Sequence, residues 1–174
     1  MEAMVRQEAR RVVDDHQLGT SHFDGLIYVM FWKQDGRVAP LYIGKAGRFG
    51  RQGDNLSANI ARALNSTHHF CRWGDGYEYH IGDLSAVTCP GHPEEHHKAK
   101  YASWARAMFE VVPAEAPRLK APVWFWMTAW EPRQSGIWED FGPTQLAFLE
   151  YLLIGVGGTL FPSLLNTEGA SSPW

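Results

Sequence analysis

The stretch that decides the fold is 25-GLIYVMFWKQDGRVAPLYIGK-45. Residues 26–32 form an almost unbroken run of apolar and aromatic side chains, which is typical of a buried strand. Asp35 and Gly36 form a dipeptide that favours a tight hairpin turn. Residues 41–44 then have the composition of a returning strand. We therefore expect an antiparallel β-hairpin at this position.

Further helices and strands are expected on both sides of the hairpin. Apolar periodicity and helix start and stop signals predict helices over residues 2–17, 54–65, 93–110 and 143–154, the last ended by Gly155, Gly157 and Gly158. Short strands are predicted over residues 77–81 and 123–130. This order predicts an α+β fold, with a small, mainly antiparallel β-sheet flanked by helices. A chain of 174 residues favours one domain, spanning residues 1–174.

Composition narrows the class of protein. Hydrophobic residues make up 45% of the chain, which argues against extended disorder. No apolar run approaches the ~20 residues that span a bilayer, so we expect no membrane association. The polar N-terminal stretch lacks the apolar segment of a signal peptide, and two cysteines cannot form a disulfide scaffold. We therefore expect a cytoplasmic protein.

Charge is distributed unevenly along the chain. The formal net charge is −3, so the chain as a whole is not a basic nucleic-acid binder. Between Lys33 and Arg72, however, seven basic residues stand against two acidic ones. Such a local positive field suits phosphate oxygens, although a solvated surface would give the same pattern.

Glu150 is a carboxylate on a face that should be apolar. On the helix predicted over 143–154, its neighbours three and four residues away are Leu146, Ala147, Leu153 and Ile154. An unpaired buried carboxylate is costly, so such a residue usually has a cation partner, a metal or a catalytic role. The spacing leaves open whether Glu150 forms a structural salt bridge with an arginine or belongs to a functional site.

Tyr28 and Tyr42 are placed symmetrically about the expected turn. They lie 14 residues apart with their midpoint at Asp35. In an antiparallel hairpin they would sit nearly opposite one another on one face. Two adjacent phenols could position a water or a phosphate, or could simply form an aromatic pair in the core. Gly44, which follows, permits close backbone approach.

Together these residues resemble the GIY-YIG nuclease superfamily. The resemblance rests on Gly25-Leu26-Ile27-Tyr28, on Tyr42-Ile43-Gly44-Lys45-Ala46, and then on Arg51, Glu150 and Asn166. It covers about residues 25–65 and 122–166, which would form a GIY-YIG-like core, with residues 66–121 as an insertion. It implies a metal-dependent endonuclease that hydrolyses DNA phosphodiester bonds, as restriction-type members do.

The resemblance also implies roles for individual residues. Tyr28 would be the general base, Tyr42 would orient the water or the phosphate, and Asn166 would hold the phosphate or the loop beneath it. Glu150 would bind one Mg²⁺ or Mn²⁺ ion, and Arg51, or Arg48 in its place, would contact the transition-state phosphate. Lys45 would assist catalysis or contact phosphate. The expected DNA contacts are Lys45, Arg48, Arg51, Arg62 and Arg72.

Two questions remain open at this level. Cutting both strands of a duplex with one site per chain favours a homodimer. The alternative function is a non-catalytic nucleic-acid-binding module on the same fold.

In the insertion, a Zn²⁺ site would draw on ligands among Cys71, Cys89, His92, His96 and His97. Because Cys71 and Cys89 lack a paired Cys-x-x-Cys knuckle, we favour polar histidines on a solvated helix start.

Overall fold

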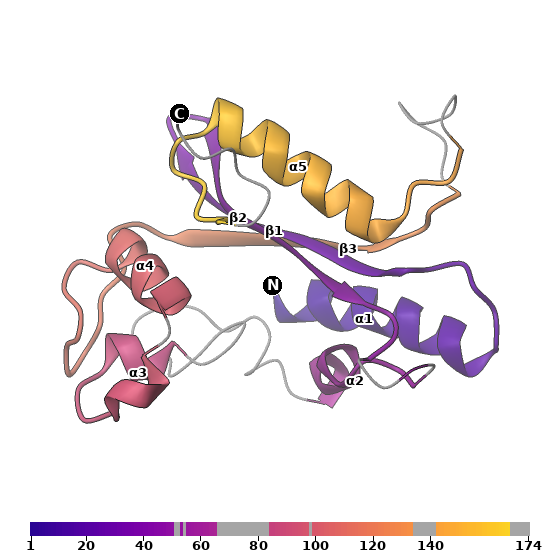
Figure 1. Cartoon of the computed structure of the whole chain (residues 1–174), viewed down its shortest axis with the longest axis horizontal. Helices are drawn as coiled ribbons and strands as arrows, with labels where there is room; N and C mark the ends of the chain where they lie inside the picture. The colour runs from indigo at the N-terminus through magenta and orange to yellow at the C-terminus, as the bar shows by residue number, and fades with distance from the viewer. Residues whose placement is uncertain (51–52, 54, 66–83, 98, 134–141, 168–174) are drawn as a thin grey trace.

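The computed structural model describes residues 1–50, 53, 55–65, 84–97, 99–133 and 142–167. The elements follow in the order α1 (Glu2–Gln17), β1 (Gly25–Gln34), β2 (Arg37–Gly47), α2 (Ala58–Asn65), α3 (Ser85–Thr88), a 3-10 turn η1 (Glu94–His96), α4 (Ala99–Met108), β3 (Val123–Trp130) and α5 (Leu146–Leu160) (Figure 1). Within the described ranges no helix is long and apolar enough to cross a membrane.

The three strands form one antiparallel sheet in the order β2-β1-β3. The predicted hairpin is confirmed, and its turn has positive φ at both Asp35 (49°) and Gly36 (74°), as the two-residue hairpin turn requires. Both strands of the hairpin are longer than the apolar runs that predicted them, since β1 extends over Gly25–Gln34 and β2 begins at Arg37 rather than residue 41. The α+β class predicted from the sequence is therefore confirmed.

The two faces of the sheet are covered by different helices. Figure 1 shows α1 and α2 below the sheet and α5 above it. The lower core includes Leu26, Tyr28 and Met30 from β1, packed with the predicted apolar face of α1. The upper core joins Ile27 and Ile43 to α5. Alternate residues of a strand point to opposite faces, and Tyr28 and Tyr42 both point to the lower face. Glu150 lies on α5, above the sheet, so it is on the opposite side from the two tyrosines.

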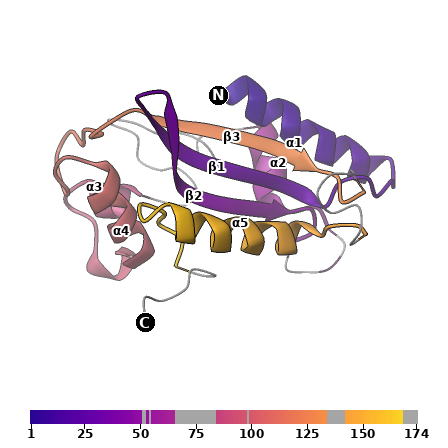
Figure 2. The same ribbon diagram turned by 90° about the horizontal axis from the view of Figure 1, so that it is seen from above.

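The helix α5 covers only part of its face of the sheet. Seen from above, it runs along β2, and the part of the sheet at β3 is left open (Figure 2). Trp124 and Trp126, on β3, are accordingly 47% and 46% exposed. The Lys33 ammonium lies 4.0 Å from the centre of the Trp124 ring.

Several element boundaries differ from the predictions. The helix expected over 54–65 begins at Ala58, and the one expected over 93–110 consists of η1 and α4. The strand expected over 77–81 lies outside the described residues. The prediction that glycines end the last helix was wrong, because α5 continues to Leu160. A Cβ on Gly157 would lie 3.2 Å from Leu164 and 3.4 Å from Ile43, so this glycine lets the helix approach β2 closely.

Candidate functional site at the outer edge of β2

The outer edge of β2 is bound by the segment that follows α5. The Asn166 side chain accepts a hydrogen bond from Ile43 N (2.9 Å) and donates one to Ile43 O (2.8 Å). Leu165 N donates to Leu41 O at 2.7 Å. The carboxamide of Asn166 thus pairs with the edge strand as another strand would. The resemblance left two roles for Asn166, and the geometry favours holding the chain over direct phosphate contact.

Glu150 forms an ion pair with Lys45 at this edge. Its Oε2 lies 2.7 Å from Nζ of Lys45, with 14% and 31% of the two side chains exposed. Lys45 follows Ile43 on the upper face of β2, and Glu150 lies one turn into α5, so the two elements face each other here. The N-terminus of α5 is held in place because Leu146 N donates to Asp24 Oδ2 at 3.2 Å. The partner that the sequence suggested was an arginine, whereas the structure supplies a lysine.

Three of the predicted site residues line one small pocket. Tyr42, Glu150 and Asn166 surround a space of about 50 Å³, together with Lys100, Tyr151, Ile154 and Thr167. Tyr42 belongs to the lower core, but β2 is an edge strand, so its ring reaches the same edge as Glu150. The space admits a few water molecules and is too small for a nucleotide.

Tyr28 lies beside Tyr42 but outside this pocket. Its ring centre is 6.2 Å from that of Tyr42, and it stacks on Phe125 at 5.6 Å. Only 3% of the residue is exposed. The ring passes over Gly44, where a Cβ would lie 2.7 Å from Tyr28 Cε2 and closer still to Cζ and Oη. Gly44 is therefore needed for Tyr28 to pack across β2, and the geometry favours a packing role over that of general base.

The expected alignment of the two tyrosines was only partly right. They share a face, but Tyr28 is opposite Gly44, and Tyr42 is opposite Met30. The register shifts between Met30 and Phe31, whose partner is Pro40, so Leu41 is an extra residue in β2. This β-bulge moves Tyr42 along the strand, and no turn residue in the sequence signals it.

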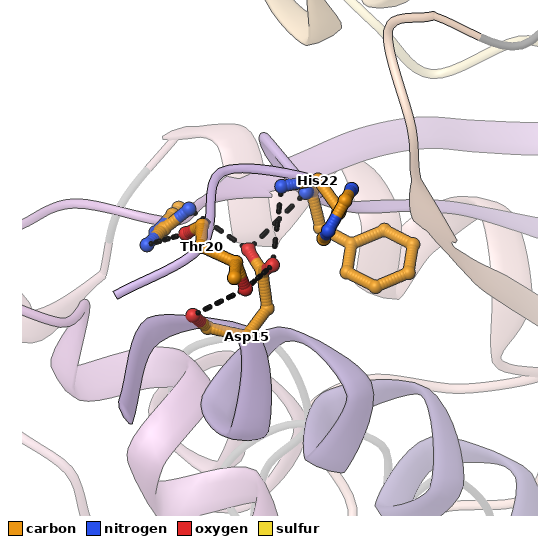
Figure 3. Close-up of polar contacts among 5 residues, drawn as sticks. Asp15, Thr20 and His22 are labelled. Atoms are coloured by element: carbon orange, nitrogen blue, oxygen red, sulfur yellow. Dashed lines mark hydrogen bonds and ion pairs between the residues drawn. The ribbon is translucent and has the colours of Figure 1, made fainter. Parts of the chain in front are cut away.

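Arg48 takes part in a different network, centred on the buried carboxylate of Asp15. Arg48 Nη1 donates to Asp15 Oδ2 (2.8 Å), and Nη2 donates to Thr20 O (2.6 Å). Figure 3 shows Thr20 and His22 gathered around Asp15, whose Oδ1 accepts from the Thr20 hydroxyl (2.6 Å) and from His22 N (3.1 Å). Arg48 is only 7% exposed, so its placement favours a structural role over the expected DNA contact.

The network also holds Asp15 in its charged form. Burial by itself raises the pKa of Asp15. The hydrogen bonds from Thr20, His22 and Phe23, together with the positive charge of Arg48, outweigh burial. The pKa of Asp15 consequently lies below its ordinary value. Arg48 and Asp15 therefore join the end of β2 to α1 as a structural ion pair.

Of the remaining basic residues expected to contact DNA, the structure describes Arg62. Arg51 and Arg72 lie outside the described residues. Arg62 is exposed on α2, which packs against the face of the sheet opposite α5 (Figure 1). Its position therefore does not support a phosphate contact beside Glu150.

Three of the residues proposed as Zn²⁺ ligands lie around one pocket of the insertion. Cys89, His92 and His97 line a separate pocket of about 370 Å³ with Arg106. Cys71 lies outside the described residues. Within the part of the chain that is described, no three His, Cys, Asp or Glu side chains lie close enough to hold a metal ion. The Zn²⁺ alternative therefore gains no support from the described residues.

The donor set at Glu150 fits a metal ion only in a limited way. Glu150 brings one carboxylate, and its Oε2 already accepts from Lys45. Mg²⁺ is commonly held by one or two carboxylates, with waters and substrate phosphates completing its coordination. Glu150 can thus be a single protein ligand through Oε1, provided that substrate supplies further oxygens.

Comparisons with known proteins assign neither a family nor a function to the chain. No protein-family model matches the chain, and no curated protein and no solved structure is significantly similar to it.

Proposed function

We propose that the protein is a metal-dependent endonuclease that hydrolyses DNA phosphodiester bonds, with a GIY-YIG-like site. The observation that supports this most strongly is the convergence at one edge of β2. Tyr42, Lys45, Glu150 and Asn166 come from two segments more than 100 residues apart in the sequence, yet Tyr42, Glu150 and Asn166 line one pocket and Lys45 is paired with Glu150.

Each of these side chains can serve phosphodiester hydrolysis. A Mg²⁺ or Mn²⁺ ion on Glu150 would neutralise phosphate charge and stabilise the leaving 3′ oxygen. The Tyr42 hydroxyl would orient the attacking water or a phosphate oxygen. Lys45 would exchange its contact with Glu150 for one with phosphate, since an ammonium pairs readily with either anion. Asn166 would keep β2 in position beneath these groups.

Lys45 also lines a second, larger pocket, in which we place part of the DNA substrate. A pocket of about 400 Å³ lies at the N-terminus of α5, lined by Lys45, Gly47, Phe49 and Gln145 among others. Its volume falls within the range of small-ligand sites, so it can receive a nucleotide-sized part of the DNA. Because one chain carries one such site, we propose that duplex cleavage is carried out by a homodimer.

One observation favours a second function, a non-catalytic nucleic-acid-binding module. The 2.7 Å ion pair with Lys45 is by itself a sufficient structural reason for a carboxylate at Glu150. In that case Lys45 would bind DNA together with basic residues outside the Arg48–Asp15 ion pair, and Glu150 would hold no metal.

Nicking of supercoiled plasmid DNA separates the two functions. The endonuclease is expected to relax the plasmid with Mg²⁺ or Mn²⁺ and to be inactive in EDTA. A gel-shift titration at several salt concentrations measures DNA binding in parallel. Salt-dependent binding without nicking under any metal condition would refute the endonuclease and support the binding module.

A further inference from the structure

Lys100, on α4, contacts the candidate site from the insertion. Its Nζ donates a hydrogen bond to Tyr42 Oη at 3.0 Å. The same ammonium lies 4.8 Å from the centre of the Tyr42 ring and 5.1 Å from that of Trp104. Lys100 also lines the 50 Å³ pocket that contains Glu150 and Asn166. None of the sequence patterns that led to the site included this residue.

The local sequence explains why Lys100 reaches Tyr42. Trp104 is 1% exposed and lies 4.4 Å from Tyr42, measured between ring centres. On a helix, residues four positions apart share a face, so Lys100 lies one turn from Trp104 on the same side of α4. Trp104 thus anchors α4 to the lower core, and this anchoring brings the ammonium over the edge of β2.

The hydrogen bond determines where the Tyr42 proton points. An ammonium has three donors and no acceptor, so Tyr42 Oη must accept from Lys100. The phenolic O–H is then directed to a different acceptor. In the pocket, the acceptors for this proton are the Glu150 carboxylate and, with metal and substrate bound, an attacking water or an oxygen of the phosphate.

We propose that Lys100 is a positioning residue for DNA cleavage, which orients the Tyr42 hydroxyl toward the reacting phosphate. This inference rests on the proposed endonuclease function. It assigns the insertion a direct part in the site, because α4 carries Lys100 within residues 66–121. Lys100 acts through Tyr42 and contributes little to overall DNA affinity.

The test is a double-mutant cycle on the single-turnover cleavage rate constant, measured with protein in excess over plasmid. Lys100→Met is expected to lower the rate constant about 10-fold, which corresponds to about 1.4 kcal/mol in activation free energy. In a Tyr42→Phe background the same change is expected to have less than a twofold effect. Lys100→Arg keeps a charged donor and should restore most of the rate, and Lys33→Met controls for the loss of one positive charge.

The protein concentration that gives half-maximal rate should change less than threefold in Lys100→Met, because the residue positions Tyr42 rather than binding DNA. Thermal unfolding of each variant checks the fold, and Lys100→Leu, which likewise has no donor, replaces Lys100→Met if that variant unfolds. A wild-type rate in Lys100→Met, or an equal loss in both backgrounds, would overturn the role of Lys100 alone. A wild-type protein that cleaves no DNA would overturn the proposed function and this inference together.

Discussion

Gly44→Ala tests how closely Tyr28 packs across β2. The added Cβ would lie 2.7 Å from Tyr28 Cε2 and closer to Cζ and Oη. The ring cannot withdraw freely, because it stacks on Phe125 and abuts Tyr42. Overpacking of this kind costs about 1–3 kcal/mol in the free energy of unfolding. A loss of about 2 kcal/mol would raise the unfolded-to-folded ratio roughly 30-fold.

Urea denaturation followed by circular dichroism measures this loss. With a slope of about 2 kcal/mol per molar urea, the midpoint of Gly44→Ala should fall by about 1 M. Gly47→Ala is the matched control on the same strand, since its Cβ would meet nothing closer than Phe49 O at 3.9 Å. In a Tyr28→Val background Gly44→Ala should cost much less. Equal midpoints for Gly44→Ala and wild type would refute the reasoning.

Three further variants test the neighbouring contacts. Asn166→Ala should lower the free energy of unfolding by about 1–3 kcal/mol, because it leaves N–H and C=O of Ile43 without their partner; unchanged urea stability would contradict this anchoring. Asp15→Asn should destabilise the protein by about 3–5 kcal/mol at pH 7 by leaving Arg48 buried without its counter-ion. Since the folded pKa of Asp15 is lowered, its contribution is present above the ordinary value of 3.8 and is lost as pH falls through the folded pKa, so the difference from wild type should shrink in acid. Denaturation at pH 7 and pH 3 measures this, and a constant difference would count against the ion pair. Lys45→Met should reduce the slope of log affinity for DNA against log salt by about 1 in gel-shift titrations, and an unchanged slope would exclude a phosphate contact.

The fold was predictable where local signals agree with tertiary packing. Asp35-Gly36 adopts the positive φ values that its composition favours, and the strand over residues 123–130 was predicted with its observed bounds. Gly157 shows the opposite case, because its low helix propensity is outweighed by close packing of α5 on β2. The boundary of a helix thus depended on a neighbour distant in the sequence.

The candidate site was predictable only in part. The apolar neighbours of Glu150 indicated that its carboxylate needs a partner, but the identity of that partner depends on how β2 faces α5. Arg48 belongs to a basic segment, and only the structure shows that Asp15 neutralises it. Lys100 had a weak signal, its position one turn before an aromatic residue, and nothing in the sequence connects that turn to Tyr42.

The most direct test of the account is the cleavage rate of Glu150→Ala. With Mg²⁺ and supercoiled plasmid, wild type and Glu110→Gln, which alters a carboxylate remote from the site, should nick the DNA at equal rates. Glu150→Ala should show no cleavage while binding DNA within a fewfold of wild type in a gel shift. Cleavage by Glu150→Ala at the wild-type rate would contradict the account.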